Sequence, residues 1–435
     1  MNRWGRYIAV GLTALFLGPW ARAAVRIDIN HGYGQKFPVA IVPFKGEQMW
    51  PPALRPSVIV RRDLTGSGWF DCLPSRDYLA KPHHAAQVQF NDWRLLKATG
   101  LLIGHMQSLN GGRVNVAFRL YGVDKGAQIQ GLEYTVSPHE LRTVGHKIAD
   151  AVYRAFTGIR GVFGTRIAYV RMYPRGLPGH FLYELEVADA EGHSVHVILR
   201  SREPIMSPRW SPQGRRLTYV SFETGWPVVY VQNVATGARF QVAAFHGLNS
   251  APAFSPDGTH LALCLSKTGY PEIYTLNLAT RQLRQLTFGP DINTEPSWSP
   301  GGGHLVFTSN RSGGPQIYEM TAHGHHKHRL TFRGRYNADA SFSPNGKWLT
   351  LVSRRRGQYH AAVFELADST LEVLTDTSLD ESPTFAPNGQ EILYSTVVGG
   401  HRVLAWVSLN GQGHRILGLR GGDVTDPAWS PFRHP

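Results

Sequence analysis

The sequence predicts two domains, an N-terminal α+β domain followed by a six-bladed β-propeller that is closed by a C-terminal strand. The main observation is a short phrase, an aromatic residue followed by Ser or Ala and then Pro, which occurs six times at intervals of 43 or 44 residues. A glycine and a second apolar run follow each of the first five copies. A period in this range is typical of architectures that pack one repeated unit against the next. The copies are at residues 210–212, 254–256, 298–300, 342–344, 385–387 and 429–431.

Each repeat is predicted to form four antiparallel strands. Pro at the second position of a turn fixes φ, and Gly at the fourth, as in Pro256 and Gly258, supplies the positive φ that returns the chain as a hairpin. Two further alternating runs complete the unit, for example residues 272–276 and 284–287. Four strands in about 44 residues make one blade of a propeller.

The ends of the repeat region predict how the ring closes. A copy of the second run at residues 167–170 has no phrase before it, and the last phrase, at residues 427–431, has no run after it. The simplest arrangement lets the C-terminal phrase supply the innermost strand of a blade whose other strands are residues 166–170, 182–187 and 195–200. This gives six complete blades and pairs edge strands that would otherwise be open to aggregation.

The segment before the repeats predicts export and a small α+β domain. Residues 1–23 combine Arg3 and Arg6, an apolar stretch and the small residues Ala21 and Ala23, which is typical of a cleaved secretory signal. The N-terminal domain is expected over residues 24–160 and the propeller over residues 165–435. Within the first domain, strands are predicted at residues 24–30, 37–44 and 113–121, and helices at 54–64, 92–99, with Asp92 as a possible cap, and 139–156. The strand at 24–30 is either an ordinary edge strand or a detachable segment that binds a partner.

Charge and motifs argue against nucleic acid, catalysis and cofactors. The net charge is +14, but the basic residues are scattered among strands, which indicates a soluble basic surface and no nucleic-acid partner. The Gly-x-Ser-x-Gly elbow of serine hydrolases does not occur, so the protein is not expected to be an enzyme. His323, His325, His326 and His328 form a dense run in a hairpin between third and fourth strands. We interpret the run as a solvated turn that binds metal adventitiously, and predict no metal site.

Several motifs resemble one family of envelope proteins. They are T-G-I-R-G-V-F-G-T-R-I-A-Y-V at residues 157–170, D-W-R at 92–94, F-R-L-Y at 118–121, H-K-I-A-D at 146–150, P-I-M-S-P at 204–208 and the repeat phrases. Together they resemble the TolB family, the periplasmic components of the Tol-Pal system, over essentially the whole mature chain. Generic propellers with such repeats lack this N-terminal domain and junction.

The resemblance implies a periplasmic adaptor that is not an enzyme. Family members bind the lipoprotein Pal through the propeller and TolA through the start of the mature chain, and they support outer-membrane integrity during cell division. Outer-membrane porins are possible secondary partners. The TolA-binding segment would be Ala24, Val25, Arg26, Ile27, Asp28 and Ile29. The alternative function is that of an exported propeller that binds a small soluble ligand in its central channel.

The surface that binds Pal would be formed by loops that lead into the innermost strands. The residues expected there are Leu248, Asn249, Ser250, Ala251, Asn293, Thr294, Glu295, Asn337, Asp339, Asp380, Glu381, Thr425 and Asp426. Leu248 departs from the family, in which histidine can occupy this position. We interpret Glu295, Asp339, Asp380, Glu381 and Asp426 as an acidic rim that orients Pal. The competing interpretation is that these loops carry Asp and Asn because such residues suit turns.

Overall fold

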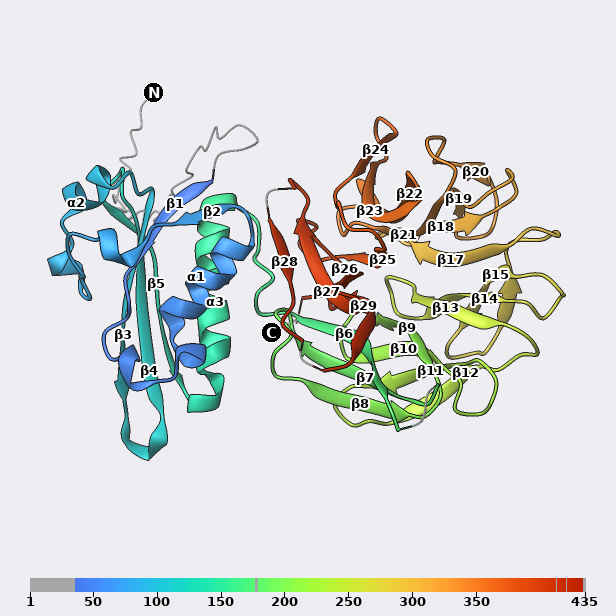
Figure 1. Ribbon diagram of the computed structural model, residues 1–435, viewed down its shortest axis with the longest axis horizontal. Coiled ribbons are helices and arrows are strands. Elements are labelled where there is room, and N and C mark those ends of the chain that lie inside the picture. Colours follow the sequence, from blue (N-terminus) through green and yellow to red (C-terminus); the bar gives the residue numbers. More distant parts are fainter. Residues whose placement is uncertain (1–35, 177–178, 412, 420, 433–435) are drawn as a thin grey trace, which may run out of the picture. The chain divides into compact units, whose positions relative to one another are not determined.

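A computed structural model describes residues 36–432 of the chain, except 177–178, 412 and 420. The predicted signal peptide, the cleavage residues Ala21 and Ala23, and the TolA-binding segment at residues 24–29 therefore lie outside the described residues. The described residues belong to one compact unit and form a five-stranded sheet with helices, followed by six four-stranded sheets (Figure 1). This is the predicted combination of an α+β domain with a six-bladed propeller.

The N-terminal domain contains a mixed sheet in the order β2-β1-β3-β4-β5. Strand β1 pairs in parallel with β2 and β3, while β3, β4 and β5 form an antiparallel meander. The strands are β1 Phe37–Ile41, β2 Phe70–Cys72, β3 Gly100–Ser108, β4 Val114–Gly122 and β5 Ala127–Val136. The α-helices are α1 Pro56–Gly66, α2 Phe90–Leu95 and α3 Leu141–Thr157. Short 3-10 turns lie at Glu47–Met49, Pro52–Leu54, Ser75–Asp77, Ala85–Gln87, Asn110–Gly112 and Pro138–Glu140.

Helix α3 carries the domain's strongest helical pattern and packs closely on α1. Its apolar residues recur at helical spacing, and Leu141, Val144 and Ile148 are fully buried. A Cβ atom at Gly145 would lie 2.8 Å from the side chain of Ile59, so glycine allows the two helices to approach. Gly158, with φ 73°, ends the helix in the left-handed conformation that favours glycine.

The second predicted helix differs from expectation. We expected it to begin with Asp92 as a cap, but α2 begins at Phe90 and Asp92 lies inside its first turn. No side chain caps this helix. Asp92 still suits the position, because a carboxylate in the first turn interacts favourably with the positive end of the helix dipole.

The propeller consists of six antiparallel sheets. Five are built from consecutive strands and the sixth has the order β29-β6-β7-β8. The first blade contains β9 Ile205–Trp210, β10 Arg216–Ser221, β11 Val228–Asn233 and β12 Arg239–Ala243, and the second contains β13 Asn249–Phe254, β14 His260–Leu265, β15 Glu272–Asn277 and β16 Leu283–Gln285. The third contains β17 Asn293–Trp298, β18 His304–Ser309, β19 Gln316–Thr321 and β20 His328–Arg329, and the fourth contains β21 Asn337–Phe342, β22 Trp348–Arg355, β23 Gln358–Glu365 and β24 Thr370–Val373. The fifth contains β25 Glu381–Phe385, β26 Glu391–Val398, β27 His401–Ser408 and β28 His414–Ile416. The sixth blade joins β29 Asp423–Trp429 to β6 Arg166–Pro174, β7 Phe181–Asp189 and β8 His196–Ser201.

The predicted closure of the ring by the C-terminal strand is confirmed. Trp429 pairs with Ile167 in the antiparallel register of β29 and β6. The Ser430 amide donates to the Arg166 carbonyl at 2.8 Å, and the Trp429 indole donates to the Thr165 hydroxyl at 2.8 Å. The last strand of the chain is thereby joined to the first strand of the propeller.

The repeated turns have the predicted chemistry. In each of the first five copies, the glycine three residues after Ser or Ala has φ between 64° and 72°, and its amide donates to the carbonyl of that Ser or Ala. In the second blade, for example, the Gly258 amide donates to the Ser255 carbonyl at 2.8 Å. The hairpin between the first two strands of each blade therefore needs glycine at this position.

Candidate functional site

The innermost strands of all six blades share a β-bulge that faces the central channel. Each strand shifts its register against the second strand at the same place. Each bulge contains one non-glycine residue with φ between 47° and 54°, which is a conformation that L-amino acids seldom adopt. All six residues line the channel, a cavity of about 1100 Å³. They are Ser207, Ala251, Glu295, Asp339, Ser382 and Asp426.

Three of these bulge residues carry carboxylates, and two of the carboxylates fasten neighbouring blades. Glu295 Oε2 accepts hydrogen bonds from the Asp339 amide at 2.8 Å and from the Thr308 hydroxyl at 2.7 Å. Asp426 Oδ1 accepts from the Ser207 amide at 3.1 Å, which joins the sixth blade to the first. The acidic side chains therefore hold the ring together as well as giving the channel its charge.

The channel has more negative than positive groups. Arg209 is the one Lys or Arg among the described residues that line it, and its guanidinium lies 3.6 Å from Asp339 Oδ1. Burial and the neighbouring Glu295 carboxylate raise the pKa of Asp339 to about 7, although Arg209 opposes the shift. Burial also raises the pKa of Asp426. We call Glu295, Asp339, Asp426 and Arg209 the channel group.

The structure corrects the predicted acidic rim at Asp380. This side chain is fully buried, and Asp380 Oδ2 accepts from the Ala361 amide at 3.2 Å and from the Thr375 hydroxyl. Asn249, Asn293 and Asn337 occupy the equivalent positions of other blades and are equally buried. Asn293 Nδ2 donates to Glu272 Oε2 on the third strand of the preceding blade at 2.9 Å, and Asn337 Nδ2 donates to Gln316 Oε1 of the preceding blade at 2.9 Å. Asn293, Asn337 and Asp380 thereby fasten each innermost strand to the preceding blade, and all four side chains are buried.

The other residues predicted to bind Pal are accessible to different extents. Leu248 is exposed, while Ser250, Thr294, Glu381 and Thr425 are half-buried. Glu381 forms an ion pair with Arg402 of the same blade, so its charge is compensated locally. The structure thus brings Glu295, Asp339 and Asp426 together in the channel, with Glu381 near them and Asp380 apart.

Sequence reasoning missed a set of exposed apolar side chains at one end of the propeller. In an antiparallel blade, the loop between the second and third strands and the loop to the next blade leave the sheet at the same end, where the innermost strands begin. We call this end the mouth. Large apolar residues in its loops are exposed by 36 to 72%, which is typical of a surface that binds another protein. They are Trp226, Leu248, Tyr270, Phe288, Ile292 and Phe332.

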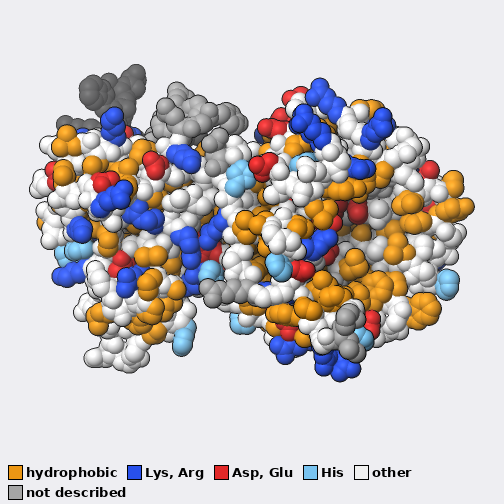
Figure 2. Space-filling model, in the orientation of Figure 1, with side chains coloured by type: hydrophobic (Ala, Val, Ile, Leu, Met, Phe, Trp, Pro, Cys, Tyr) orange, Lys and Arg blue, Asp and Glu red, His pale blue; other side chains and the backbone are white. Residues whose placement is uncertain are grey.

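The charge distribution of the surface agrees with the scattered basic residues of the sequence. On the face shown in Figure 2, Lys and Arg side chains lie in several separate groups over both domains, and hydrophobic side chains gather over the propeller. In the described part of the chain, no helix is both long and apolar enough to cross a membrane.

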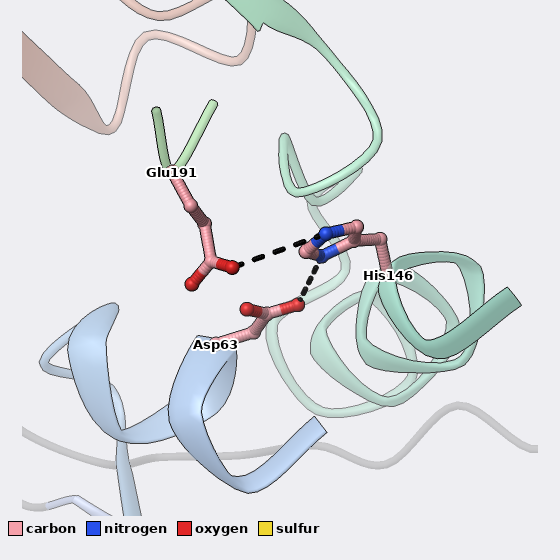
Figure 3. Close-up of side chains that lie close together, drawn as sticks. All are labelled: Asp63, His146 and Glu191. Carbon is pink, nitrogen blue, oxygen red and sulfur yellow. Dashed lines mark hydrogen bonds and ion pairs between the residues drawn. The ribbon is translucent and has the colours of Figure 1, made fainter. Parts of the chain in front are cut away.

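A second polar cluster joins the N-terminal domain to the propeller. It comprises Asp63 of α1, His146 and Arg142 of α3, and Asp189 and Glu191 at and after the end of β7, together with Arg62 and Arg415. His146 Nδ1 lies 2.7 Å from Asp63 Oδ2, and its Nε2 lies 3.9 Å from Glu191 Oε2 (Figure 3). We call these seven residues the interface cluster.

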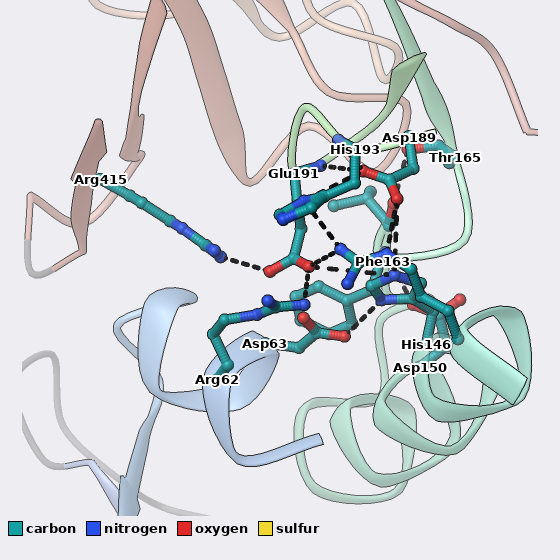
Figure 4. Close-up of polar contacts among 12 residues, drawn as sticks. Arg62, Asp63, His146, Asp150, Phe163, Thr165, Asp189, Glu191, His193 and Arg415 are labelled. Atoms are coloured by element: carbon teal, nitrogen blue, oxygen red, sulfur yellow. Dashed lines mark hydrogen bonds and ion pairs between the residues drawn. The ribbon is translucent and has the colours of Figure 1, made fainter. Parts of the chain in front are cut away.

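Glu191 is the centre of the interface cluster. It forms ion pairs with Arg62 from α1 and with Arg415 from β28, the latter at 2.7 Å (Figure 4). It also pairs with Arg142 from α3 at 2.5 Å. Burial alone would raise the pKa of Glu191, but the guanidinium groups of Arg415 and Arg62 lower it to about 2. By contrast, burial raises the pKa of Asp63 to about 7, although His146 opposes the shift.

The chemistry of the interface cluster favours a structural role over metal binding. Ligand atoms of Asp63, His146 and Glu191 lie within 4.8 Å of one another, which is close enough for a shared metal ion. However, three arginines already neutralise Glu191, and a metal cation would add to their positive charge. We therefore assign the cluster to the attachment of the two domains. The one signal in the sequence was His146 on the buried face of α3, which does not reveal its partners.

Comparisons with known proteins match both domains to one family. The TolB amino-terminal domain family matches residues 25–129, and the TolB beta propeller domain family matches residues 153–433. The chain is 56% identical over 426 residues to the Tol-Pal system protein TolB of Nitrosococcus oceani, covering 97% of this chain and 98% of that protein. It is 56% identical over 414 residues to the protein of the same name from Methylobacillus flagellatus, covering 95% and 94%. The crystal structure of TolB from Acinetobacter baumannii superposes with a TM-score of 0.83 at 38% identity, covering 92% of this chain and 97% of that one.

Proposed function

Because the chain belongs to the TolB family of Tol-Pal system proteins, we propose that it is a periplasmic adaptor without enzymatic activity. In this proposal the mouth of the propeller binds the lipoprotein Pal, and residues 24–29 bind TolA. Residues 1–23 direct export and are removed, residues 24–160 form the N-terminal domain, and residues 165–435 form the propeller. The adaptor supports outer-membrane integrity and invagination during cell division.

The observation that supports Pal binding most strongly is the composition of the mouth. Exposed apolar side chains such as Trp226, Phe288 and Phe332 surround a channel lined by three carboxylates. Protein interfaces commonly combine apolar anchors that provide affinity with charges that provide orientation. The same surface is expected to contact a partner through Leu248, Ser250, Thr294, Glu381 and Thr425 at its accessible positions.

The TolA segment provides a second part of the proposal. Residues 24–29 either pack on the body of the protein or detach to meet TolA. Binding of Pal shifts this equilibrium only if Pal has different affinities for the two states. Pinning the segment to the body by an engineered disulfide should therefore abolish TolA binding, and intact TolA binding after pinning would disprove the switch.

One observation favours the alternative of a small soluble ligand. The channel has a volume of about 1100 Å³, and it places Arg209 opposite the Asp339 carboxylate. A pocket of this size with both signs of charge suits a polar small molecule. In that case Pal would not be captured, and a ligand would co-purify with the propeller.

The test is capture of Pal from crosslinked envelopes, repeated with two matched surface variants. Leu248→Asp places a charge in the mouth, and Ile416→Asp places one on β28, an outermost strand; both parent side chains are exposed. Leu248→Asp should weaken Pal binding at least about tenfold, or about 1.4 kcal/mol, while Ile416→Asp should leave it unchanged. Equal effects of the two variants would refute binding at the mouth, and absence of Pal from the captured material would favour the soluble ligand.

A further inference from the structure

Five exposed arginines lie at the mouth in two neighbouring loops of the third and fourth blades. The loop that leads from the third blade into the fourth, residues 330–336, carries two of them, and the tip of the β22–β23 hairpin carries three. The two loops are in contact, because the Arg354 amide donates to the Tyr336 carbonyl at 3.0 Å and the rings of Tyr336 and Tyr359 pack edge to face. We call Arg333, Arg335, Arg354, Arg355 and Arg356 the arginine arc.

The hairpin that carries three of these arginines is longer than its counterparts in the first three blades. Strands β22 and β23 each contain eight residues, whereas the corresponding strands of those blades contain six. Arg354 and Arg355 are the additional residues of β22 at the mouth. The turn itself consists of Arg356 and Gly357, which have positive φ values of 51° and 90°. Asn-Gly is the usual choice for such a two-residue turn, so turn geometry does not explain an arginine there.

The other loop is fixed by hydrogen bonds from buried side chains. Gln316 Nε2 donates to the Gly334 carbonyl at 3.2 Å, and Asn337 Nδ2 donates to the Arg333 carbonyl at 2.8 Å. Both Gln316 and Asn337 are buried. The backbone that carries Arg333 and Arg335 is therefore held in place, and these two arginines have a defined position relative to the hairpin.

Carboxylates of the protein do not compensate the charge of the arginine arc. Among the described residues, none of its five members forms an ion pair, and the two loops contain no Asp or Glu. Within the same part of the chain, Asp376 is exposed in the next loop of the mouth but is not paired with these arginines. The carboxylates of the channel group are half-buried, whereas the arc is exposed. A partner that approaches this side of the mouth from solvent therefore meets positive charge before it meets the channel carboxylates.

We propose that the arginine arc binds an acidic surface of the protein that docks on the mouth. This inference rests on the proposed function, in which that protein is Pal. The planar guanidinium group pairs with a carboxylate through two parallel hydrogen bonds, so several arginines at fixed positions recognise a matching set of Asp and Glu side chains. Phe332, which is 72% exposed in the same loop, supplies an apolar contact beside the charges. Charges at the edge of an interface act mainly on orientation and on the association rate.

The alternative partner for such a group of arginines is a membrane that contains anionic lipids. Attraction to lipid phosphates depends on the number of basic residues and needs no fixed arrangement of them. The arginine arc instead has a fixed backbone, and it lies at the same end of the propeller as the exposed side chains of Phe288 and Ile292. Fixed charges beside apolar side chains favour a folded protein with a surface of complementary shape.

The test measures the rate at which Pal associates with the full mature protein, by stopped-flow fluorescence at several ionic strengths. Arg335→Gln combined with Arg355→Gln removes two charges from the arc. Arg216→Gln combined with Lys347→Gln is the matched control, because it removes two exposed charges at the opposite end of the propeller. The arc variant should associate at least about fivefold more slowly at low ionic strength and depend less on salt. The control should stay within about twofold of the parent, and circular dichroism would confirm that both variants remain folded.

Four results would overturn the inference. A parent-like rate in the arc variant, or equal slowing in both variants, would show that the arc makes no local contact with Pal, while the proposed function would stand. Faster association of the arc variant would mean that Pal presents positive charge to the arc. Sedimentation with phosphatidylglycerol vesicles that is lost in the arc variant, together with unchanged Pal association, would assign the arc to a membrane. If the parent protein does not bind Pal, the proposed function fails together with the inference.

Discussion

The interface cluster and the channel group combine carboxylates with arginines in different proportions: three carboxylates meet three arginines in the first, and three carboxylates meet one arginine in the second. Glu191 at the domain interface meets three guanidinium groups, and its pKa falls to about 2. Asp339 in the channel is close to Glu295 but meets one arginine, and its pKa rises to about 7. Burial favours the neutral form in both places, so the number of nearby cations decides the sign of the shift. The compensated cluster suits permanent attachment, while the channel group has too few cations to keep its buried carboxylates at their ordinary pKa.

The largest expected effect comes from deleting residues 427–435. The deletion removes Ala428 and Trp429 from the channel wall but retains every residue of the interface cluster. Hydrogen exchange should therefore show loss of protection in β6 and the innermost strands, with protection kept in α1 and α3. Unchanged protection in β6 would show that the ring does not depend on β29. Full-length protein with Phe432→Ala serves as the control for a change near the C-terminus that leaves β29 intact.

The second effect concerns the compensated cluster. Glu191→Gln leaves Arg62, Arg142 and Arg415 without their shared carboxylate, so the free energy of unfolding should fall by about 3 kcal/mol. Because the Glu191 pKa is lowered from 4.5, its stabilisation is present above about pH 4.5 and is lost as the pH falls toward 2. The variant should therefore lose less stability on acidification than the parent, as measured by urea unfolding.

A matched control for this prediction is Glu223→Gln. Glu223 forms an ion pair with Arg239 at 2.7 Å near the surface, where both side chains are partly exposed. Such pairs contribute less than about 1 kcal/mol. Equal losses of stability in the two variants would mean that the interface cluster has no special role.

The smallest effect concerns the channel group and has the opposite pH dependence. Because the folded-state pKa of Asp339 is raised from 3.8 to about 7, the unfolded chain releases this proton first, and stability should fall as the pH rises from about 4 to 7. Asp339→Asn removes that loss and should stabilise the protein by about 1 to 2 kcal/mol at about pH 8. This gain is smaller than the free energy equivalent to the whole pKa shift, because the Asp339 side chain is partly exposed and Arg209 loses its partner. Urea unfolding across this range checks the slope, and an unchanged slope would contradict the uncompensated state of the channel.

Repetition made the propeller predictable, because six copies of one phrase specify the strands, the glycine turns and the partner of the last strand. The same repetition concealed the role of Asp380. Asn and Asp suit a loop, but in this fold they also fasten the innermost strand to the preceding blade, as Asn293 and Asn337 do. The sequence pattern cannot distinguish the two roles, since both use short polar side chains.

The interface cluster could not be predicted for a different reason. Asp63, His146, Glu191 and Arg415 come from four separate parts of the sequence and meet only when the two domains pack together. No local period connects them.

The pairing of β29 with β6 also determines the order of assembly. Residues Ile167 and Trp429 stand at the two ends of the propeller sequence, and their contact has one of the longest separations in the chain. Five blades consist of consecutive strands, whereas the sixth cannot form until the final residues of the propeller are available. We therefore expect the ring to close late in folding, and a chain without β29 to remain an open arc.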